Sequence, residues 1–162
     1  MKKLPISFFL LCLWLTGCTT HSKPGIEGYV VKKESGRILV VASESEDFSS
    51  TGGLKEFYPA IWFSHASNKA DVGDKVQIWF DVVMESYPGQ AEAEKVLVLP
   101  SKKPKNADLT ESDAIRKALT SKELNLPNIP AIQSTSYHSK TDVWEVVIHS
   151  GESEVTVQIS DN

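Results

Sequence analysis

Between residues 26 and 99, short apolar runs alternate with turn-forming residues, and no helical period is sustained. Five of these runs have the length and composition of strands. They are Gly28–Lys33, Arg37–Ala42, Ala60–Ser64, Lys75–Val83 and Lys95–Leu99. The first two flank Glu34-Ser35-Gly36, a short connection with glycine, so we expect them to pair as an antiparallel hairpin.

The fourth run shows which face of such a strand is buried. Val76, Ile78, Phe80 and Val82 share one face, and Gln77, Trp79 and Asp81 share the other. Trp62, Trp79 and Trp144 all lie in strand patterns and are expected in the core, with an exposed contact as the alternative for Trp79 because of its place on the polar face. Five short strands in about 75 residues predict a mainly β fold, a small OB-like five-stranded barrel over residues 26–99. A small sandwich is the alternative.

A different pattern follows the barrel. Residues 100–108, with two prolines and three lysines, are typical of a linker. Thr110 can then cap a helix, and Asp113 can complete a capping box. The helix would bury Ala114, Ile115, Ala118 and Leu119, and leave Glu111, Arg116 and Lys117 in solvent.

Three more strands are predicted after Asn125–Pro130, a segment with two prolines that ends the helix. They are Ile132–His138, Val143–His149 and Glu154–Ser160. In the last two, apolar residues such as Trp144 and Val157 alternate with polar ones. Residues 109–162 therefore predict a small α+β module, with one helix on a three-stranded antiparallel sheet.

The N-terminus predicts export. Met1-Lys2-Lys3 is positively charged and Ile6–Leu15 is almost wholly apolar, so residues 1–17 are typical of a signal peptide. The apolar run is too short to span a membrane, which takes about 20 residues. Leu15-Thr16-Gly17-Cys18 resembles the lipobox of bacterial lipoproteins. The resemblance implies cleavage between Gly17 and Cys18 and a diacylglyceryl group on the Cys18 thiol.

Cleavage and lipidation would have consequences for the position, the cysteines and the charge of the mature chain. Residues 18–25 would form a tether of at most about 25 Å, which keeps the folded part at the extracytoplasmic face of the cell membrane. Cys12 lies in the leader and Cys18 would be acylated, so no disulfide is expected. Loss of Lys2 and Lys3 leaves 15 basic and 21 acidic residues, a balance that disfavours binding to nucleic acid.

Several segments together resemble the YobA-like family of bacterial lipoproteins, over about residues 25–100. They are Gly28-Tyr29-Val30-Val31, Asp47–Gly53, Ala60–Ser64 and Glu85–Ala91. The resemblance implies an OB-like barrel on a lipid anchor. The family has no established biochemical role, so no catalytic residue is carried over. Residues 109–160, around Asp142-Val143-Trp144, resemble a PepSY-type module.

No motif for catalysis, cofactor binding or metal binding stands out. A nucleophile elbow and a phosphate-binding glycine loop are both missing from the sequence. His21, His65, His138 and His149 lack metal-ligand spacing, and Glu44, Glu46 and Asp47 lack the spacing of a calcium loop. We therefore expect no enzyme activity, no cofactor and no metal.

Two loops are candidates for binding. Residues 43–59 form a connection too long for a tight turn, and it contains Phe48, Phe57 and Tyr58. Tyr87 lies in the turn candidate Tyr87-Pro88-Gly89-Gln90, at a place where OB-like folds often bind ligands. Alternatively, the aromatic side chains plug the end of the barrel.

The function expected from these observations is a non-enzymatic envelope lipoprotein. It would bind a partner protein or an envelope polymer close to the membrane. One alternative is a modulator of an extracellular enzyme or sensor that acts through the C-terminal module. Another is a hydrolase or ligand-binding enzyme with an unrecognised site.

Overall fold

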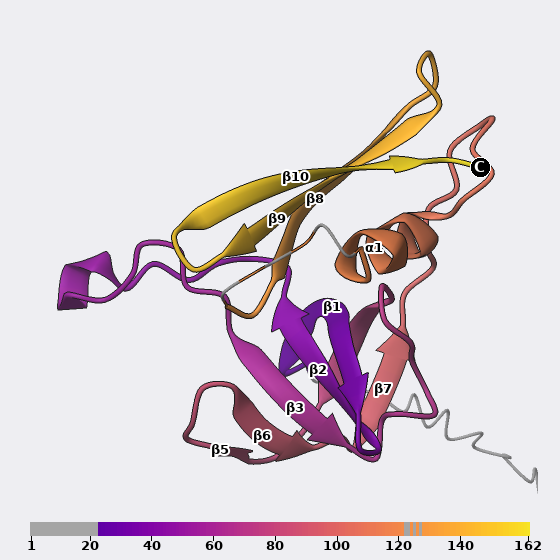
Figure 1. The fold of residues 1–162 in the computed structure, drawn as a ribbon. Coiled ribbons are helices and arrows are strands. Elements are labelled where there is room, and N and C mark those ends of the chain that lie inside the picture. The colour runs from indigo at the N-terminus through magenta and orange to yellow at the C-terminus, as the bar shows by residue number, and fades with distance from the viewer. Residues whose placement is uncertain (1–22, 122–123, 125, 127) are drawn as a thin grey trace, which may run out of the picture.

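The computed structural model describes residues 23–121, 124, 126 and 128–162. Two modules make up this part of the chain (Figure 1). The first is a seven-stranded mixed sheet, and the second is a three-stranded antiparallel sheet with one α-helix. The mainly β fold and the α+β character of the C-terminal half agree with the sequence prediction.

The seven-stranded sheet has the order β5-β6-β3-β2-β1-β4-β7. Its strands are β1 (Ile26–Glu34), β2 (Arg37–Ala42), β3 (Ala60–Ser64), β4 (Lys75–Trp79), β5 (Val83–Met84), β6 (Gly89–Glu92) and β7 (Lys95–Val98). The predicted hairpin is present, because β1 pairs antiparallel with β2. β1 also pairs antiparallel with β4, and β4 with β7, whereas β3 and β6 are parallel.

Only Ala93 and Glu94 separate β6 from β7. The Ala93 N–H donates to the carbonyl oxygen of Ser64, at the end of β3, over 3.2 Å. The Glu94 N–H donates to the carbonyl oxygen of Trp79, at the end of β4, over 3.0 Å. Residues 89–98 therefore bond to β3 along their first half and to β4 along their second.

Two details of the sequence prediction are wrong in this module. The fourth strand ends at Trp79, so Val82 is 74% exposed and does not share the buried face of Val76 and Ile78. Gly89 and Gln90, expected in a turn, belong to strand β6. β6 has the sequence Gly-Gln-Ala-Glu, which has little β propensity. Tertiary pairing overrides this propensity, because β6 pairs with β3 on one side and with β5 on the other.

The C-terminal module consists of helix α1 (Glu111–Leu119) and strands β8 (Ala131–His138), β9 (Val143–Ser150) and β10 (Ser153–Ser160), in the order β10-β9-β8. The capping box is as predicted, since the Thr110 side chain accepts from the Asp113 N–H and Asp113 accepts from the Thr110 N–H. Ala114, Ile115 and Ala118 are buried, and they pack with Trp144, Val146 and Ile148 of β9.

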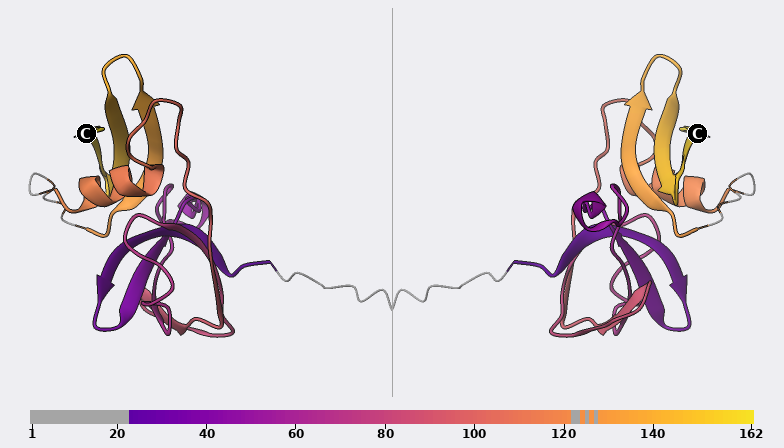
Figure 2. Two further views of the ribbon diagram at one scale, coloured as in Figure 1. Left: turned by 90° about the vertical axis from the view of Figure 1, so that its right-hand side faces the viewer. Right: turned by 90° about the vertical axis from the view of Figure 1, so that its left-hand side faces the viewer.

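The two modules pack against each other (Figure 2). One face of the seven-stranded sheet forms its own core around Ile38, Phe63 and Ile78. The other face, with Val31, Leu39 and Val41, packs with Ala131 of β8 and with Leu119 and Ile129. A single apolar core therefore joins β1 and β2 to the C-terminal module.

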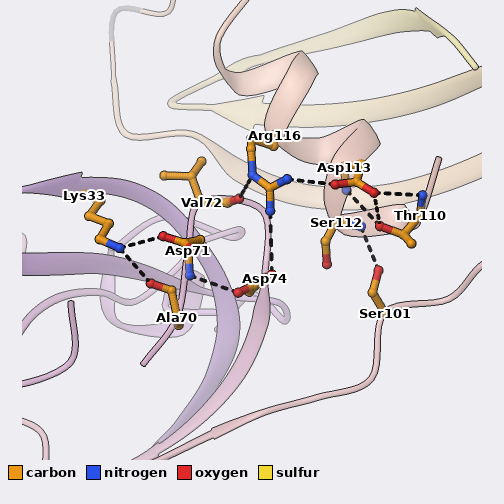
Figure 3. A network of polar contacts seen from close by, with 10 residues as sticks. All are labelled: Lys33, Ala70, Asp71, Val72, Asp74, Ser101, Thr110, Ser112, Asp113 and Arg116. Carbon is orange, nitrogen blue, oxygen red and sulfur yellow. Dashed lines mark hydrogen bonds and ion pairs between the residues drawn. The ribbon is translucent and has the colours of Figure 1, made fainter. Parts of the chain in front are cut away.

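A polar contact reinforces this junction (Figure 3). The turn of residues 71–74 lies against α1, and the Arg116 side chain donates to the carbonyl oxygen of Val72 over 2.8 Å and to Asp113 over 2.8 Å. Arg116 was expected in solvent, but it is half-buried between the modules. Residues of the predicted linker also contact α1, since Ser101 Oγ accepts from the Ser112 N–H over 2.9 Å.

Candidate functional site

The loop of residues 43–59, called the arm below, stands off the molecule between β2 and β3 (Figure 1). Its two sides pair through Glu46 and Phe57, with N···O distances of 2.7 and 3.0 Å. The short 3₁₀ helix η1 (Ser49–Thr51) forms its tip. The Phe48 N–H donates to the carbonyl oxygen of Leu54 over 2.9 Å. The arm therefore has its own backbone hydrogen bonds.

Three aromatic side chains form a continuous row from the arm to the β5–β6 connection. We call Phe48, Phe57 and Tyr87 the aromatic strip. The ring centroids of Phe48 and Phe57 are 5.6 Å apart, and those of Phe57 and Tyr87 are 5.3 Å apart. Phe48 is 41% exposed and Tyr87 is 57% exposed. These rings contact one another at the surface, which leaves apolar area open to solvent.

Tyr58 lies at the base of the strip. It is 8% exposed and belongs to the core shared by the two modules. Its carbonyl oxygen accepts from the Tyr87 hydroxyl over 3.4 Å. The structure thus brings together all four residues proposed from the sequence, with Tyr58 as the support and the strip as the exposed part.

A cleft of about 240 Å³ lies beside the strip. Its lining comes from both modules: Leu54, Glu56, Phe57, Tyr58, Tyr87, Asn128, Ile129, Ala131, His149 and Gly151. The Tyr58 and His149 ring centroids are 5.2 Å apart, and His149 Nδ1 is 4.0 Å from Glu56 Oε2. A second hollow of about 340 Å³ shares Leu54, Glu56, His149 and Gly151 with the cleft. The arm and the β9–β10 turn are therefore the two walls of one groove.

The walls of this groove are acidic. Glu56 on the arm and Glu152 on the opposite wall line it against one basic residue, Lys55, and the arm also carries Glu44, Glu46 and Asp47 outside this lining. Hydrogen bonds from the Ser49 side chain and backbone hold the pKa of Asp47 below its usual range. The groove therefore has an excess of negative charge at neutral pH.

The tyrosines of the site stay neutral and can donate hydrogen bonds. Burial and the nearby Glu56 carboxylate raise the pKa of Tyr58, and burial raises the pKa of Tyr87. Their hydroxyl groups are therefore protonated well above neutral pH. The site combines apolar rings, phenolic donors and carboxylates, which suits the binding of an apolar group with a positive charge nearby.

Leu54, Glu56 and His149 were not predicted as site residues. Leu54 is 54% exposed and lies in the arm, so a search for apolar residues in long loops could have found it. Glu56 is an exposed acidic residue of the same loop, and nothing in its local sequence distinguishes it from the other acidic residues there. His149 comes from β9, far along the chain, and no local signal connects it to the arm.

No cluster of side chains suited to metal binding is present in the described ranges. Those residues contain no group of three or more His, Cys, Asp and Glu side chains that could hold a metal ion. His65 contacts Glu92 over 2.7 Å and His138 lies 4.0 Å from Glu145, each apart from the groove.

The burial of the tryptophans differs in part from the prediction. Trp144 is in the core, as expected. Trp62 is only half-buried, and the guanidinium of Arg37 lies 4.8 Å from the centroid of its ring. Trp79 is half-buried on the outer face of β4, with the Lys95 ammonium 4.4 Å from its ring centroid.

Gly17, Cys18 and His21 lie outside the described residues, and so do the predicted signal peptide and most of the tether. Among the residues that are described, no helix is long and apolar enough to cross a bilayer.

Comparisons with known proteins agree with the resemblance found in the sequence. Residues 27–100 match a family described as "Protein of unknown function (DUF3221)". The chain is similar to the uncharacterized protein YobA of Bacillus subtilis (strain 168), with 28% identity over 120 residues, which cover 61% of this chain and 100% of the relative. No solved structure matches. The resemblance to a YobA-like family is thereby confirmed, and the matched residues contain the arm and Tyr87.

Proposed function

We propose, on the premise that residues 27–100 carry a YobA-like domain of unknown function, that this chain is a non-enzymatic lipoprotein of the cell envelope. It is anchored through Cys18 at the extracytoplasmic face of the cell membrane. It binds a partner protein in the groove between the arm and the β9–β10 turn.

The observation that carries this proposal is the convergence of exposed aromatic side chains on one groove. Phe48 and Phe57 come from the two sides of the arm, and Tyr87 comes from the β5–β6 connection. Exposed aromatic residues beside a cleft are typical of the residues that supply most of the binding energy in protein interfaces. Phe48 and Tyr87 are exposed, and Phe57 is half-buried between them.

The partner is a protein segment that presents an apolar side chain next to basic residues. The apolar side chain would fill the cleft of about 240 Å³ against Phe57 and Tyr58. The basic residues would face Glu56 on one wall and Glu152 on the other. Complementary charge increases the rate of association and selects among partners.

An OB-like barrel is part of the proposal for residues 26–99. Its support is the pairing of residues 89–98, which bond to β3 through β6 and to β4 through β7. Only Ala93 and Glu94 lie between β6 and β7, so one segment joins the end strand β7 to β6, the strand next to the other end of the sheet. The meander of β1, β2 and β3 also fits this topology.

In-cell photo-crosslinking tests the binding site. A photoreactive phenylalanine analogue placed at position 57 or 87 of the full chain is expected to capture the same envelope protein from both positions. The matched control is position 141, which is exposed in the β8–β9 turn at the opposite end of the strands. We expect no adduct with that protein from position 141.

Substitutions then connect the captured protein to the groove. With the analogue at position 57, Tyr87→Ala is expected to reduce the apparent affinity about tenfold or more, because it removes an exposed aromatic contact. Leu97→Ala, which truncates another exposed apolar residue (44%), should leave capture unchanged. Absence of an adduct from both positions, or equal capture from position 141, would contradict the proposal.

A further inference from the structure

β10 is an edge strand. One hydrogen-bonding edge of β10 pairs with β9, and within the described residues no strand pairs with the other edge. The opposite edge of the same sheet is different, because β8 lies against β1 and β2 of the other module. In Figure 1, β10 runs along the outside of the C-terminal module for its whole length.

The sequence of β10 lacks the features that usually prevent edge strands from pairing. Such features are short length, proline, lysine and β-bulges. β5 is only two residues long, and β8 has a bulge between Ile132 and Ser134. β10 has eight residues, Ser-Glu-Val-Thr-Val-Gln-Ile-Ser, and pairs with β9 in an unbroken register. Its only charged side chain is that of Glu154.

Both faces of β10 can continue into another strand. Val155, Val157 and Ile159 are half-buried on the inner face, the face that α1 covers. Glu154, Thr156 and Gln158 are exposed on the outer face. A second strand with the same alternation, paired with the free edge of β10, would place its apolar side chains on the face that α1 covers and its polar side chains on the face open to solvent.

We propose that β10 pairs antiparallel with β10 of a second copy of this chain, so that the two three-stranded sheets form one continuous sheet. The interface is isologous, with a two-fold axis perpendicular to the sheet. This axis keeps the α1 helices of both copies on the same face. Residues that lie opposite each other in an antiparallel pair have their side chains on the same face. One residue of β10 must therefore lie opposite the same residue of the second copy, and the axis passes between these two residues.

Two registers place the axis near the middle of β10. In both of them apolar residues face apolar residues and polar residues face polar residues. With the axis at Val157, Val155 faces Ile159 and Thr156 faces Gln158. With the axis at Thr156, Val155 faces Val157 and Glu154 faces Gln158. Neither register places two charged residues opposite each other, which would be unfavourable. The self-complementarity of one strand on both faces is the reason to assign a second copy, rather than an unrelated strand, to this edge.

Disulfide crosslinking of the full chain in its native membranes tests the pairing. Opposite Cα atoms of an antiparallel pair lie about 4.5–5.5 Å apart, which is within the range for a disulfide. Oxidation is expected to give a covalent dimer from Thr156→Cys alone if the axis is at Thr156. If the axis is at Val157, the dimer should form when Thr156→Cys and Gln158→Cys chains are co-expressed.

Ser136→Cys is the matched control, because Ser136 is a small exposed residue on the outer face of β8 in the same sheet. The parent chain, with Cys12 and Cys18 only, measures any background. A dimer from position 136 at equal yield would overturn the proposal. So would a crosslink from β10 that joins this chain only to a different protein.

Charge substitutions give a second, reversible readout. In Glu154→Gln/Thr156→Lys/Gln158→Lys, the lysines at positions 156 and 158 face each other in the Val157 register, and the two lysines at position 156 face each other in the Thr156 register. The Glu154→Gln change removes the carboxylate that would otherwise attract the lysine at position 158 in the Thr156 register. We expect the dissociation constant of the dimer, from sedimentation of the full chain in detergent, to rise about tenfold. Ser134→Lys/Ser136→Lys/Glu145→Gln changes the charge by the same amount on β8 and β9 and should leave the dissociation constant unchanged. A parent chain that is monomeric at about 100 µM contradicts the proposal.

Discussion

Asp161 is a buried carboxylate to which three parts of the C-terminal module bind. It is 1% exposed, and its oxygens accept hydrogen bonds from the backbone N–H groups of Asp108 and Leu109 and from the indole N–H of Trp144. Burial by itself raises the pKa of Asp161, but these hydrogen bonds outweigh burial and the pKa is lowered. The sequence offered no sign of this role, because the groups that bind Asp161 lie 17 to 53 residues away along the chain.

The lowered pKa of Asp161 predicts a pH dependence of stability. A carboxyl group whose folded-state pKa is below its unfolded value of about 3.9 stabilises the fold above that pH. This contribution is lost as the pH falls through the folded-state pKa. Asp161→Asn should therefore have a lower melting temperature than the parent chain at pH 7, and the difference should shrink below about pH 4.

Thermal unfolding followed by circular dichroism between pH 2.5 and 7 measures this difference. Glu44→Gln, in the exposed part of the arm, is the matched control and should follow the parent chain at every pH. A melting-temperature difference for Asp161→Asn that does not change with pH would show that the charge of Asp161 has no part in stability.

At the scale of elements, the contact between α1 and the turn of residues 71–74 decides how the modules meet. The Gly73 N–H donates to the carbonyl oxygen of Val30 over 2.9 Å, and the Val30 N–H donates to that of Asp74 over 2.9 Å. Gly73 has φ +94°, and a Cβ there would collide with the carbonyl oxygen of Ser112 in α1. The turn leads directly into β4, and it is also the surface on which α1 packs.

We expect Gly73→Ala to destabilise the protein for two reasons, the positive φ and the collision with α1. Gly36→Ala is the matched control, since Gly36 has φ +77° and no atom within 4 Å of the added Cβ. Gly36→Ala should cost about 1 kcal/mol from backbone strain. Gly73→Ala should cost about 1–3 kcal/mol more, as overpacking does.

Urea unfolding of the two glycine variants gives these free energies. In Gly73→Ala the modules should also unfold at separate midpoints, because their contact is loosened. Equal costs for the two variants would mean that the approach of α1 to the turn contributes nothing to stability.

At the scale of the whole molecule, both modules contribute to the groove and to the core that joins them. Glu56 and Tyr58 come from the N-terminal module, whereas His149 and Gly151 come from the C-terminal one. Deletion of residues 109–162 would remove one wall of the groove and also expose Val31, Leu39 and Val41. Point substitutions in the groove therefore test partner binding better than deletion does.

Anchoring concerns the molecule as a whole, and its proposed residue is Cys18. Cys18→Ala is expected to release the folded chain from the membrane or to leave an unprocessed precursor, because the thiol that would accept the lipid is gone. Cell fractionation and the mass of the chain measure both outcomes. Cys12→Ala, in the apolar run of the leader, should leave anchoring intact. A correctly processed Cys18→Ala chain that stays in the membrane fraction contradicts the lipid anchor.

The sequence by itself determined the elements with strong local patterns. The hairpin of β1 and β2, the bounds of β3, the capped helix α1 and the three strands after it all follow from short-range alternation, turn residues and capping. The sequence failed for β6, whose residues have little β propensity and form a strand by pairing with β3 and β5.

Only the tertiary structure decided which residues share a site. The sequence identified Phe48, Phe57, Tyr58 and Tyr87 as loop residues, but their contacts join segments about 30 residues apart. His149 reaches the same groove from β9 because the second face of β2 packs against the C-terminal module. Local patterns record which side of an element is buried, whereas a groove depends on which buried sides meet.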